Sequence, residues 1–229
     1  MQFALVLLAI SGAIIIAAGL TIAALLDRLR GLERQAITDP LTGAFNRRHY
    51  EHCLQTAIER RTRFNEPASL VVFDVDRFKD VNDRFGHTSG DAVLKALVVL
   101  VRRRARSLDL LFRTGGEEFA LLLSGARLDE AIGFGEEFRA SVAASRLLHG
   151  HVVSISVGVS ELRQGQSPLE WLLEADLALY HAKNAGRNQV VGAAANTGGR
   201  DVPRLFGVSQ AVAHGPTLSD CRHRAAARA

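Results

Sequence analysis

The spacing of apolar and polar positions changes period several times between residues 46 and 191, and it predicts alternating helices and strands. Helices are predicted over residues 46–63, 88–104, 128–145 and 168–185. Strands are predicted over the apolar or alternating runs 69–76, 109–113, 119–123, 153–160 and 188–191. Two of these runs flank Thr-Gly-Gly-Glu, the signal of a hairpin whose glycines meet a need for positive φ. The pattern predicts an α/β (α+β) sandwich with a mixed central sheet and flanking helices.

The amino-terminal segment has a different character. Residues 3–26 contain no charged side chain and only two hydroxyl side chains. At about 1.5 Å per residue, such a helix crosses a hydrocarbon core roughly 30 Å thick. A signal peptide would need a positive start and a small-residue cleavage site, and a buried core helix would show a polar face. We therefore expect one transmembrane helix in residues 1–26. Arg28, Arg30 and Arg34 follow it, which places the rest of the chain in the cytoplasm.

Residues 27–38 form a linker with the pattern of a short coiled-coil helix. Its seam, spaced 4-3-4, consists of Leu25, Leu29, Leu32 and Ala36. The seam is shorter than two heptads, so it supports pairing of two chains only as a continuation of the membrane helix. The turn residues from Asp39 to Gly43 then end the helix.

The charge of the chain is concentrated at its carboxyl end. The formal net charge is +4, but residues 193–229 carry five arginines against two aspartates. The body of the protein is therefore nearly neutral, and we expect no nucleic-acid partner. Residues 193–229 lack any periodic pattern and are predicted to be a disordered basic tail, with a partner-binding role left open. Cys53 and Cys221 form neither a metal-ligand spacing nor a disulfide framework, which fits a reducing compartment.

Acidic side chains are placed where a metal ion could bind. Asp74 lies at the carboxyl end of an apolar strand, where an unpaired carboxylate is costly to bury. Glu117 and Glu118 belong to the predicted hairpin, and Gly115 and Gly116 before them leave space for a ligand. Carboxylates at adjacent strand ends suit Mg2+ or Mn2+, and basic residues downstream suggest triphosphate chemistry. Taken alone, these acids could equally solvate the edge of a sheet.

A set of motifs narrows this choice. They are DPLTGAFNRR at residues 39–48, FDVDRFKDVND at 73–83, GHTSGD at 86–91, RTGGEEF at 113–119, SISVGV at 154–159 and AKNAGRN at 182–188. In order and spacing this set resembles the GGDEF family of diguanylate cyclases, with GGEEF as a variant of the signature, over residues 39–192. The resemblance implies a fold related to nucleotidyl cyclases and polymerase palm domains. It also implies condensation of two GTP into cyclic di-GMP and pyrophosphate, with one GTP per subunit of a two-fold homodimer in a bacterial cytoplasmic membrane.

The resemblance also implies roles for the acidic residues. Asp74, the backbone carbonyl of Val75 and Glu117 would hold two Mg2+ or Mn2+ ions per active site. Glu117 would accept the proton of the attacking 3′-hydroxyl, and Glu118 would assist in positioning. Lys79 would neutralise phosphate charge as in-line attack develops it.

Further positions would bind the nucleotide. By the same resemblance, Asn82 and Asp91 would hydrogen-bond the guanine edge, His87 would contact the nucleotide, and Lys183 and Arg187 would neutralise phosphates. Each has a simpler alternative: Asp91 could cap the following helix, and the two cations could serve the helix dipole. Two acids of the second motif are expected to serve structure or solubility, namely Asp76 and Asp83.

A final pair lies upstream of the hairpin. Arg106 and Asp109 stand at the spacing of the family's inhibitory product site, an Arg-x-x-Asp. Arginine binds guanine or phosphate bidentately, and a carboxylate accepts from the guanine edge. We therefore expect feedback inhibition by cyclic di-GMP at this pair.

Two other classes of function compete with the enzyme. The chain could be a binding module that has lost catalysis and senses the dinucleotide, or a scaffold that acts through its membrane helix and tail. Degeneration of the enzyme should show at the metal and guanine positions, and none of those residues is missing. Between residues 26 and 39 there is no room for a sensory domain, so we expect regulation through dimerisation or a partner.

Overall fold

The computed structural model describes residues 12, 15–23, 25 and 37–193. The chain divides into two units, Met1–Thr38 and Asp39–Ala229. Within the described ranges, no helix has both the length and the apolar character needed to cross a membrane. The predicted span, linker and tail lie largely outside the described residues, so they stay predictions.

The second unit holds the mixed sheet. Its elements in chain order are β1 (Phe45–Asn46), α2 (Arg47–Phe64), β2 (Ala68–Val75), α3 (Phe78–Phe85), α4 (His87–Arg102), β3 (Leu110–Arg113), β4 (Glu118–Ser124), α5 (Leu128–Ala144), β5 (Ile155–Glu161), α6 (Pro168–Asn184) and β6 (Val190–Gly192). The strands are ordered β1-β3-β4-β2-β5-β6. Strand β2 pairs antiparallel with β4 and β5, whereas β1 pairs with β3 and β5 with β6 in parallel. The predicted mixed sheet with flanking helices is confirmed.

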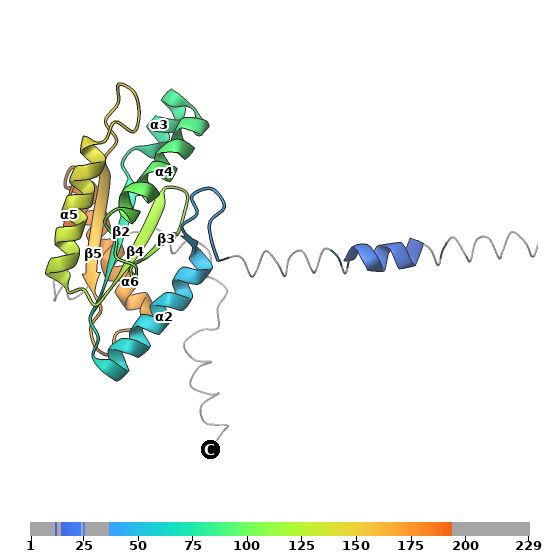
Figure 1. The fold of residues 1–229 in the computed structure, drawn as a ribbon, viewed down its shortest axis with the longest axis horizontal. Helices are drawn as coiled ribbons and strands as arrows, with labels where there is room; N and C mark the ends of the chain where they lie inside the picture. Colours follow the sequence, from blue (N-terminus) through green and yellow to red (C-terminus); the bar gives the residue numbers. More distant parts are fainter. Residues whose placement is uncertain (1–11, 13–14, 24, 26–36, 194–229) are drawn as a thin grey trace, which may run out of the picture. The chain divides into compact units, whose positions relative to one another are not determined.

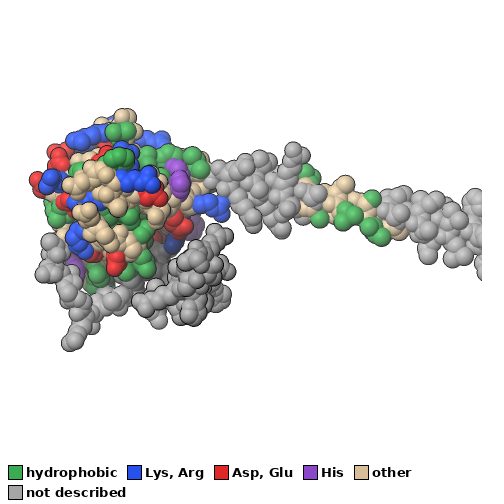
Figure 2. Space-filling model, turned by 90° about the horizontal axis from the view of Figure 1, so that it is seen from below, with side chains coloured by type: hydrophobic (Ala, Val, Ile, Leu, Met, Phe, Trp, Pro, Cys, Tyr) green, Lys and Arg blue, Asp and Glu red, His purple; other side chains and the backbone are tan. Residues whose placement is uncertain are grey.

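Helices cover both faces of the sheet (Figure 1). Val71, Phe73 and Val75 of β2 join a core cluster with α3, α4 and α5. Leu70 and Val72, the alternate positions of the same strand, join a second cluster with α2 and α6. Because side chains alternate along a strand, Asp74 points to the face that carries α2 and α6. On the face of the domain seen in Figure 2, acidic and basic side chains lie interspersed.

The predicted helices and strands are confirmed within a few residues at each end, but two short elements were not predicted. Helix α3 buries only Phe78 and Val81, and five of its eight residues are polar or charged, so its apolar face is narrow. Strand β1 has two residues, too few for any periodic signal.

Asp76 fastens the end of the central strand. Its carboxylate accepts hydrogen bonds from the hydroxyls of Ser154 and Ser156 at 2.7 and 2.6 Å, and from the backbone N–H of Asn188 at 3.0 Å. Three donors satisfy a group that is 9% exposed and would otherwise be costly to bury. The structural role expected of Asp76 is therefore confirmed.

The close packing of α6 on β5 depends on Gly158. A Cβ at Gly158 would overlap the backbone of Ala175 and Leu179. Gly158→Ala should therefore lower the free energy of unfolding by about 2–3 kcal/mol, because helix backbone cannot move aside as a side chain can. Urea titration followed by circular dichroism measures this change.

The matched control for this substitution is Gly133→Ala in α5. Gly133 is exposed and has nothing within 4 Å of an added Cβ. Because alanine favours a helix interior over glycine by about 1 kcal/mol, this variant should be as stable as the parent or more so. Equal effects of the two substitutions would contradict the close-packing argument.

Candidate active site

A buried carboxylate and a lysine form the centre of the site. Asp74 is 6% exposed, and its Oδ2 lies 2.9 Å from Nζ of Lys183, in the last turn of α6. Asp74 pairs across the sheet with Glu118 at the start of β4, so their side chains share one face. Burial raises the pKa of Asp74 to about 6; Lys183 partly offsets this effect, and the charges of Glu117 and Glu118 add to it. Lys183 therefore does more than serve the helix dipole.

The neighbouring acids repel one another. Burial raises the pKa of Glu118, with Lys183 and Arg47 opposing this shift and Glu117 reinforcing it. Oxygen ligands that repel one another in this way are the type that binds a divalent cation, so the residues fit Mg2+ or Mn2+ in kind. Within the part of the chain that the structure describes, no three such side chains have the spacing of a metal site, and the Lys183 ammonium lies against Asp74. A cation that bound here would have to displace the Lys183 ammonium from Asp74.

Two buried polar side chains near this cluster, Asp176 and Tyr50, were not predicted to belong to the site. Asp176 of α6 is buried, and its Oδ2 has no hydrogen-bond partner among the described residues; the same holds for the hydroxyl of Tyr50 in α2. Burial raises the pKa of Asp176 to about 7, reinforced by Glu118 and opposed by Arg47 and Lys183. Burial and the charge of Asp176 raise the pKa of Tyr50 far above its usual range. The sequence did offer one signal for Asp176: it precedes Lys183 by about two helical turns, on one face of the same helix.

Arg113 holds the hairpin that carries Glu117. Its Nε and Nη2 donate to the carbonyl of Gly116 at 3.1 and 2.7 Å, and its Nη1 donates to Oδ1 of Asp39 at 3.1 Å. The expectation that both hairpin glycines adopt positive φ is wrong, since neither Gly115 nor Gly116 does. A Cβ at Gly115 would meet the carboxylate of Glu118, so a side chain there would oblige that carboxylate to move.

The predicted guanine contacts lie on two adjacent helices. Asn82 belongs to α3 and Asp91 to α4, and the two helices are so close that a Cβ at Gly90 would overlap the amide of Asn82. Helix α4 begins at His87 and is preceded by Gly86, so the alternative that Asp91 caps this helix is wrong. Helices α3 and α4 thus carry an amide and a carboxylate, the groups that a guanine edge can pair with.

The remaining predicted cations are exposed. Lys79 is the second residue of α3, and Arg187 follows α6 with a left-handed backbone, φ 64°. Arg187 lines a cavity of about 410 Å3 together with Arg77, Asp76 and Asn188. The structure brings Lys183 to the acidic cluster, but it places no direct contact between Arg187 and those acids.

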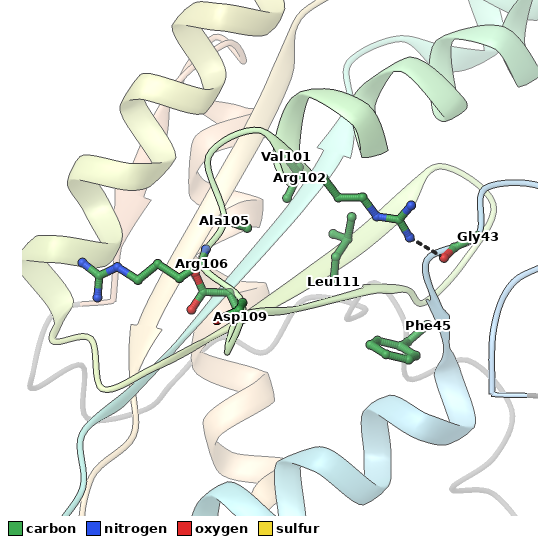
Figure 3. A pocket seen from close by; sticks show the side chains of 9 residues that line it. Gly43, Phe45, Val101, Arg102, Ala105, Arg106, Asp109 and Leu111 are labelled. Atoms are coloured by element: carbon green, nitrogen blue, oxygen red, sulfur yellow. Dashed lines mark hydrogen bonds between the residues drawn. The ribbon is translucent and has the colours of Figure 1, made fainter.

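Arg106 and Asp109 lie at a separate pocket (Figure 3). This pocket has a volume of about 270 Å3 between the end of α4, the following loop and β1, and Arg102, Asp109 and Phe45 line it. The backbone N–H of Arg106 donates to Oδ2 of Asp109 at 2.6 Å, which closes the Arg-x-x-Asp segment into a turn. Burial raises the pKa of Asp109 despite this hydrogen bond. The guanidinium of Arg106 points away from Arg102 and leaves the pocket open.

Comparisons with known proteins agree on one family. A family model described as "Diguanylate cyclase, GGDEF domain" matches residues 36–189. The chain is 41% identical over 162 residues to diguanylate cyclase DgcM of Escherichia coli, covering 71% of this chain and 40% of that protein. It is 40% identical over 166 residues to response regulator PleD of Caulobacter vibrioides, covering 70% of this chain and 37% of that protein. The chain thus spans about two fifths of the length of these relatives.

Solved structures are similar as well. The coiled coil and GGDEF domain of DgcB from Caulobacter crescentus, in complex with c-di-GMP, superimposes with a TM-score of 0.67 at 29% identity, covering 79% of this chain and 98% of that one. Diguanylate cyclase SiaD of Pseudomonas aeruginosa, in complex with its activator SiaC, gives a TM-score of 0.66 at 38% identity, covering 76% of this chain and 71% of that one.

The raised pKa of Asp176 generates a prediction about stability. A carboxyl whose pKa is higher in the folded than in the unfolded state disfavours folding as it ionises, so stability falls as pH rises from about 4 through about 7. Asp176→Asn removes this titration. The unfolding free energy that Asp176→Asn gains over the parent should therefore be larger at pH 8 than at pH 5, by on the order of 2 kcal/mol.

Urea titrations at both pH values, with a chelator present, measure the difference. Any change that the amide makes to packing is the same at both pH values and cancels. The matched control is Asp129→Asn, at an exposed acid of α5, which should show no such difference. A gain for Asp176→Asn that is independent of pH would show that this carboxyl does not titrate in this range.

Proposed function

Because the chain belongs to the GGDEF family of diguanylate cyclases, we propose that it condenses two GTP into cyclic di-GMP and pyrophosphate. The observation that carries the proposal is the meeting of Asp74 and Lys183 at 2.9 Å beside Glu118, at the end of the central strands. This arrangement offers carboxylates for a cation and an ammonium for a phosphate within one buried site. The family match and the 39–41% identity of several diguanylate cyclases support it.

The chemistry requires two phosphodiester bonds. In each, a 3′-oxygen attacks an α-phosphorus, its proton leaves, and the bond to pyrophosphate breaks. Asp74, the carbonyl of Val75 and Glu117 would hold two Mg2+ or Mn2+ ions, which when bound neutralise charge on the reacting phosphate. Glu117 accepts the proton of the 3′-hydroxyl, and Glu118 helps to position the metal ion or the hydroxyl.

The nucleotide is held by the surrounding helices. Asn82 and Asp91 pair with the guanine edge from α3 and α4, and His87, at the first turn of α4, contacts the nucleotide. Lys79 and Lys183, with Arg187, stabilise the phosphates and the leaving pyrophosphate. Gly115 and Gly116 keep the hairpin free of side chains where the substrate approaches.

The site needs a second copy of the chain. One site holds one GTP, and the ring closes only when each nucleotide attacks the other, so two sites must face each other in a two-fold homodimer. We further propose that residues 3–26 cross the bacterial cytoplasmic membrane once, with the catalytic domain in the cytoplasm. The linker at residues 27–38 then pairs two chains and brings their sites together.

Product feedback at Arg106 and Asp109 completes the proposal. The pocket beside them combines a carboxylate with arginines, groups that bind guanine and phosphate. The DgcB structures similar to this chain are complexes with c-di-GMP, which supports product binding in such domains.

The cyclase assay tests the reaction. Full-length protein supplied with GTP and Mg2+ should form cyclic di-GMP, and Glu117→Gln should lower turnover at least a thousandfold, since it removes both the proton acceptor and a metal ligand. Glu137→Gln, at an exposed glutamate of α5 on the opposite face of the sheet, is the matched control and should leave turnover unchanged. Absence of product even from an enforced dimer would refute the enzyme and favour a binding module.

The anchor generates a separate prediction. A chain of residues 36–229 should show a smaller dimer fraction and a lower turnover than the full-length protein in membranes, because the membrane helices no longer concentrate the partners. Light scattering and the cyclase assay measure the two quantities, and fusion to a dimeric coiled coil should restore turnover. Equal dimer fraction and turnover for the two forms would contradict the role of the anchor.

A further inference from the structure

Arg102, the last residue of α4, links the pocket beside Asp109 to the turn that begins the catalytic domain. Its Nη2 donates to the carbonyl of Gly43 at 2.6 Å, across the pocket that both residues line (Figure 3). Gly43 has a left-handed backbone, φ 68°, which turns this carbonyl toward α4. The contact joins two segments that are 59 residues apart in the chain.

The turn from Asp39 to Ala44 is also held by hydrogen bonds within itself. The N–H of Asp39 donates to the carbonyl of Ala44 at 2.7 Å, and the N–H of Gly43 donates to the carbonyl of Asp39 at 2.9 Å. Thr42 donates to the Asp39 carboxylate from its backbone N–H and its hydroxyl. Because these hydrogen bonds close the turn into a ring, a displacement of Gly43 is expected to displace Asp39 as well.

Asp39 passes the constraint to the catalytic hairpin. Both of its carboxylate oxygens accept from Nη1 of Arg113, at 3.1 and 3.3 Å, and Arg113 in turn holds the carbonyl of Gly116. Burial alone would raise the pKa of Asp39, but the hydrogen bonds from Thr42 and Arg113 lower it below its ordinary value, so the link stays charged. Gly116 immediately precedes Glu117. Hydrogen bonds therefore run without a gap from the pocket to the residue beside the proposed general base.

The first link in this series is the easiest to exchange. The Arg102 side chain is exposed, and its acceptor at Gly43 is a neutral carbonyl. A phosphate is a stronger acceptor for a guanidinium than a carbonyl is, because both partners are then charged. A dinucleotide in the pocket would carry such phosphates to the place where Arg102 now lies.

We propose that Arg102 is a positioning residue that couples this pocket to the catalytic hairpin within one subunit. In the free protein it holds the Asp39–Ala44 turn and, through Arg113, the hairpin. When cyclic di-GMP enters, the guanidinium exchanges the Gly43 carbonyl for a phosphate of the ligand, and the hairpin loses its support. This inference rests on the proposed cyclase and its feedback, and it adds the route by which the product acts.

Arg102→Met tests the route, with Arg104→Met as the matched control at an exposed arginine that does not line the pocket. For full-length Arg102→Met, we expect a three- to tenfold fall in kcat with little change in KM for GTP. At saturating cyclic di-GMP, the remaining inhibition should be less than half of that of the parent. Arg102→Lys, which keeps the charge, should recover part of the inhibition, and Arg104→Met should behave as the parent.

The amplitude of inhibition separates coupling from affinity. If Arg102 only contributes to binding, Arg102→Met will be inhibited fully at a higher concentration of cyclic di-GMP, and the inference fails. A merely structural role would lower kcat but leave the amplitude of inhibition unchanged, and it would also overturn the inference.

A second measurement needs no turnover. Added cyclic di-GMP should speed hydrogen exchange at the backbone amides of Asp39 and Gly43 in the parent, and Arg102→Met should show the faster exchange without ligand. If these amides respond but no cyclic di-GMP is made from GTP, the proposed enzyme fails and the coupling stands. If the protein is an active cyclase but the amides do not respond, or the dinucleotide does not bind, the coupling is wrong.

Discussion

The burial of the Asp74 carboxylate is the constraint on which the arrangement of the site depends. Alternation along β2 places Asp74 on the same face as Leu70 and Val72, between helices rather than in water. A buried carboxylate must be paired or protonated, and Lys183 supplies the pairing charge at 2.9 Å. That contact requires α6 to lie directly on β5, and only a glycine at position 158 allows this approach. The contact of Asp74 with Lys183 and the packing of α6 on β5 thus depend on each other.

Much of the fold could be predicted because its elements are long and periodic. Strand β2 has an apolar run from Leu70 to Phe73, and α6 opens with Pro168 after a Ser167 that accepts from the N–H of Glu170. The hairpin of β3 and β4 could also be predicted, and the pairing of β4 with β2 then places Glu118 opposite Asp74. Helix α3 could not, because its apolar positions are few and polar side chains outnumber them.

Features created only by the tertiary fold were out of reach. The spacing of Asp176 and Lys183 on one helix was visible, but Glu118, the acid that acts on Asp176, comes from strand β4. The contact of Arg102 with Gly43 joins distant segments, and nothing local distinguishes Arg102 from the two arginines that follow it. Positive φ was inferred from the hairpin signal, whereas neither hairpin glycine has it, and an added Cβ at Gly115 would instead meet the Glu118 carboxylate. The turn signal therefore located the hairpin glycines correctly but not their backbone conformation.

The two glutamates of the hairpin are held with different firmness, and this difference makes the site adjustable. Glu118 is fixed by its pairing with Asp74 in the sheet, whereas Glu117 precedes the first paired residue of β4. Its position depends on Arg113, which holds the carbonyl of Gly116. At an effective dielectric constant of about 20, moving a carboxylate from roughly 4 to 5 Å from a dication weakens their attraction by about 1.7 kcal/mol, more than a tenfold change in affinity. If Glu117 holds a cation as proposed, a displacement of one ångström at Glu117 would change cation binding greatly while the sheet stays intact. In the proposed cyclase, a change at the Asp39–Ala44 turn, which Arg113 joins to Gly116, would therefore act on the position of Glu117.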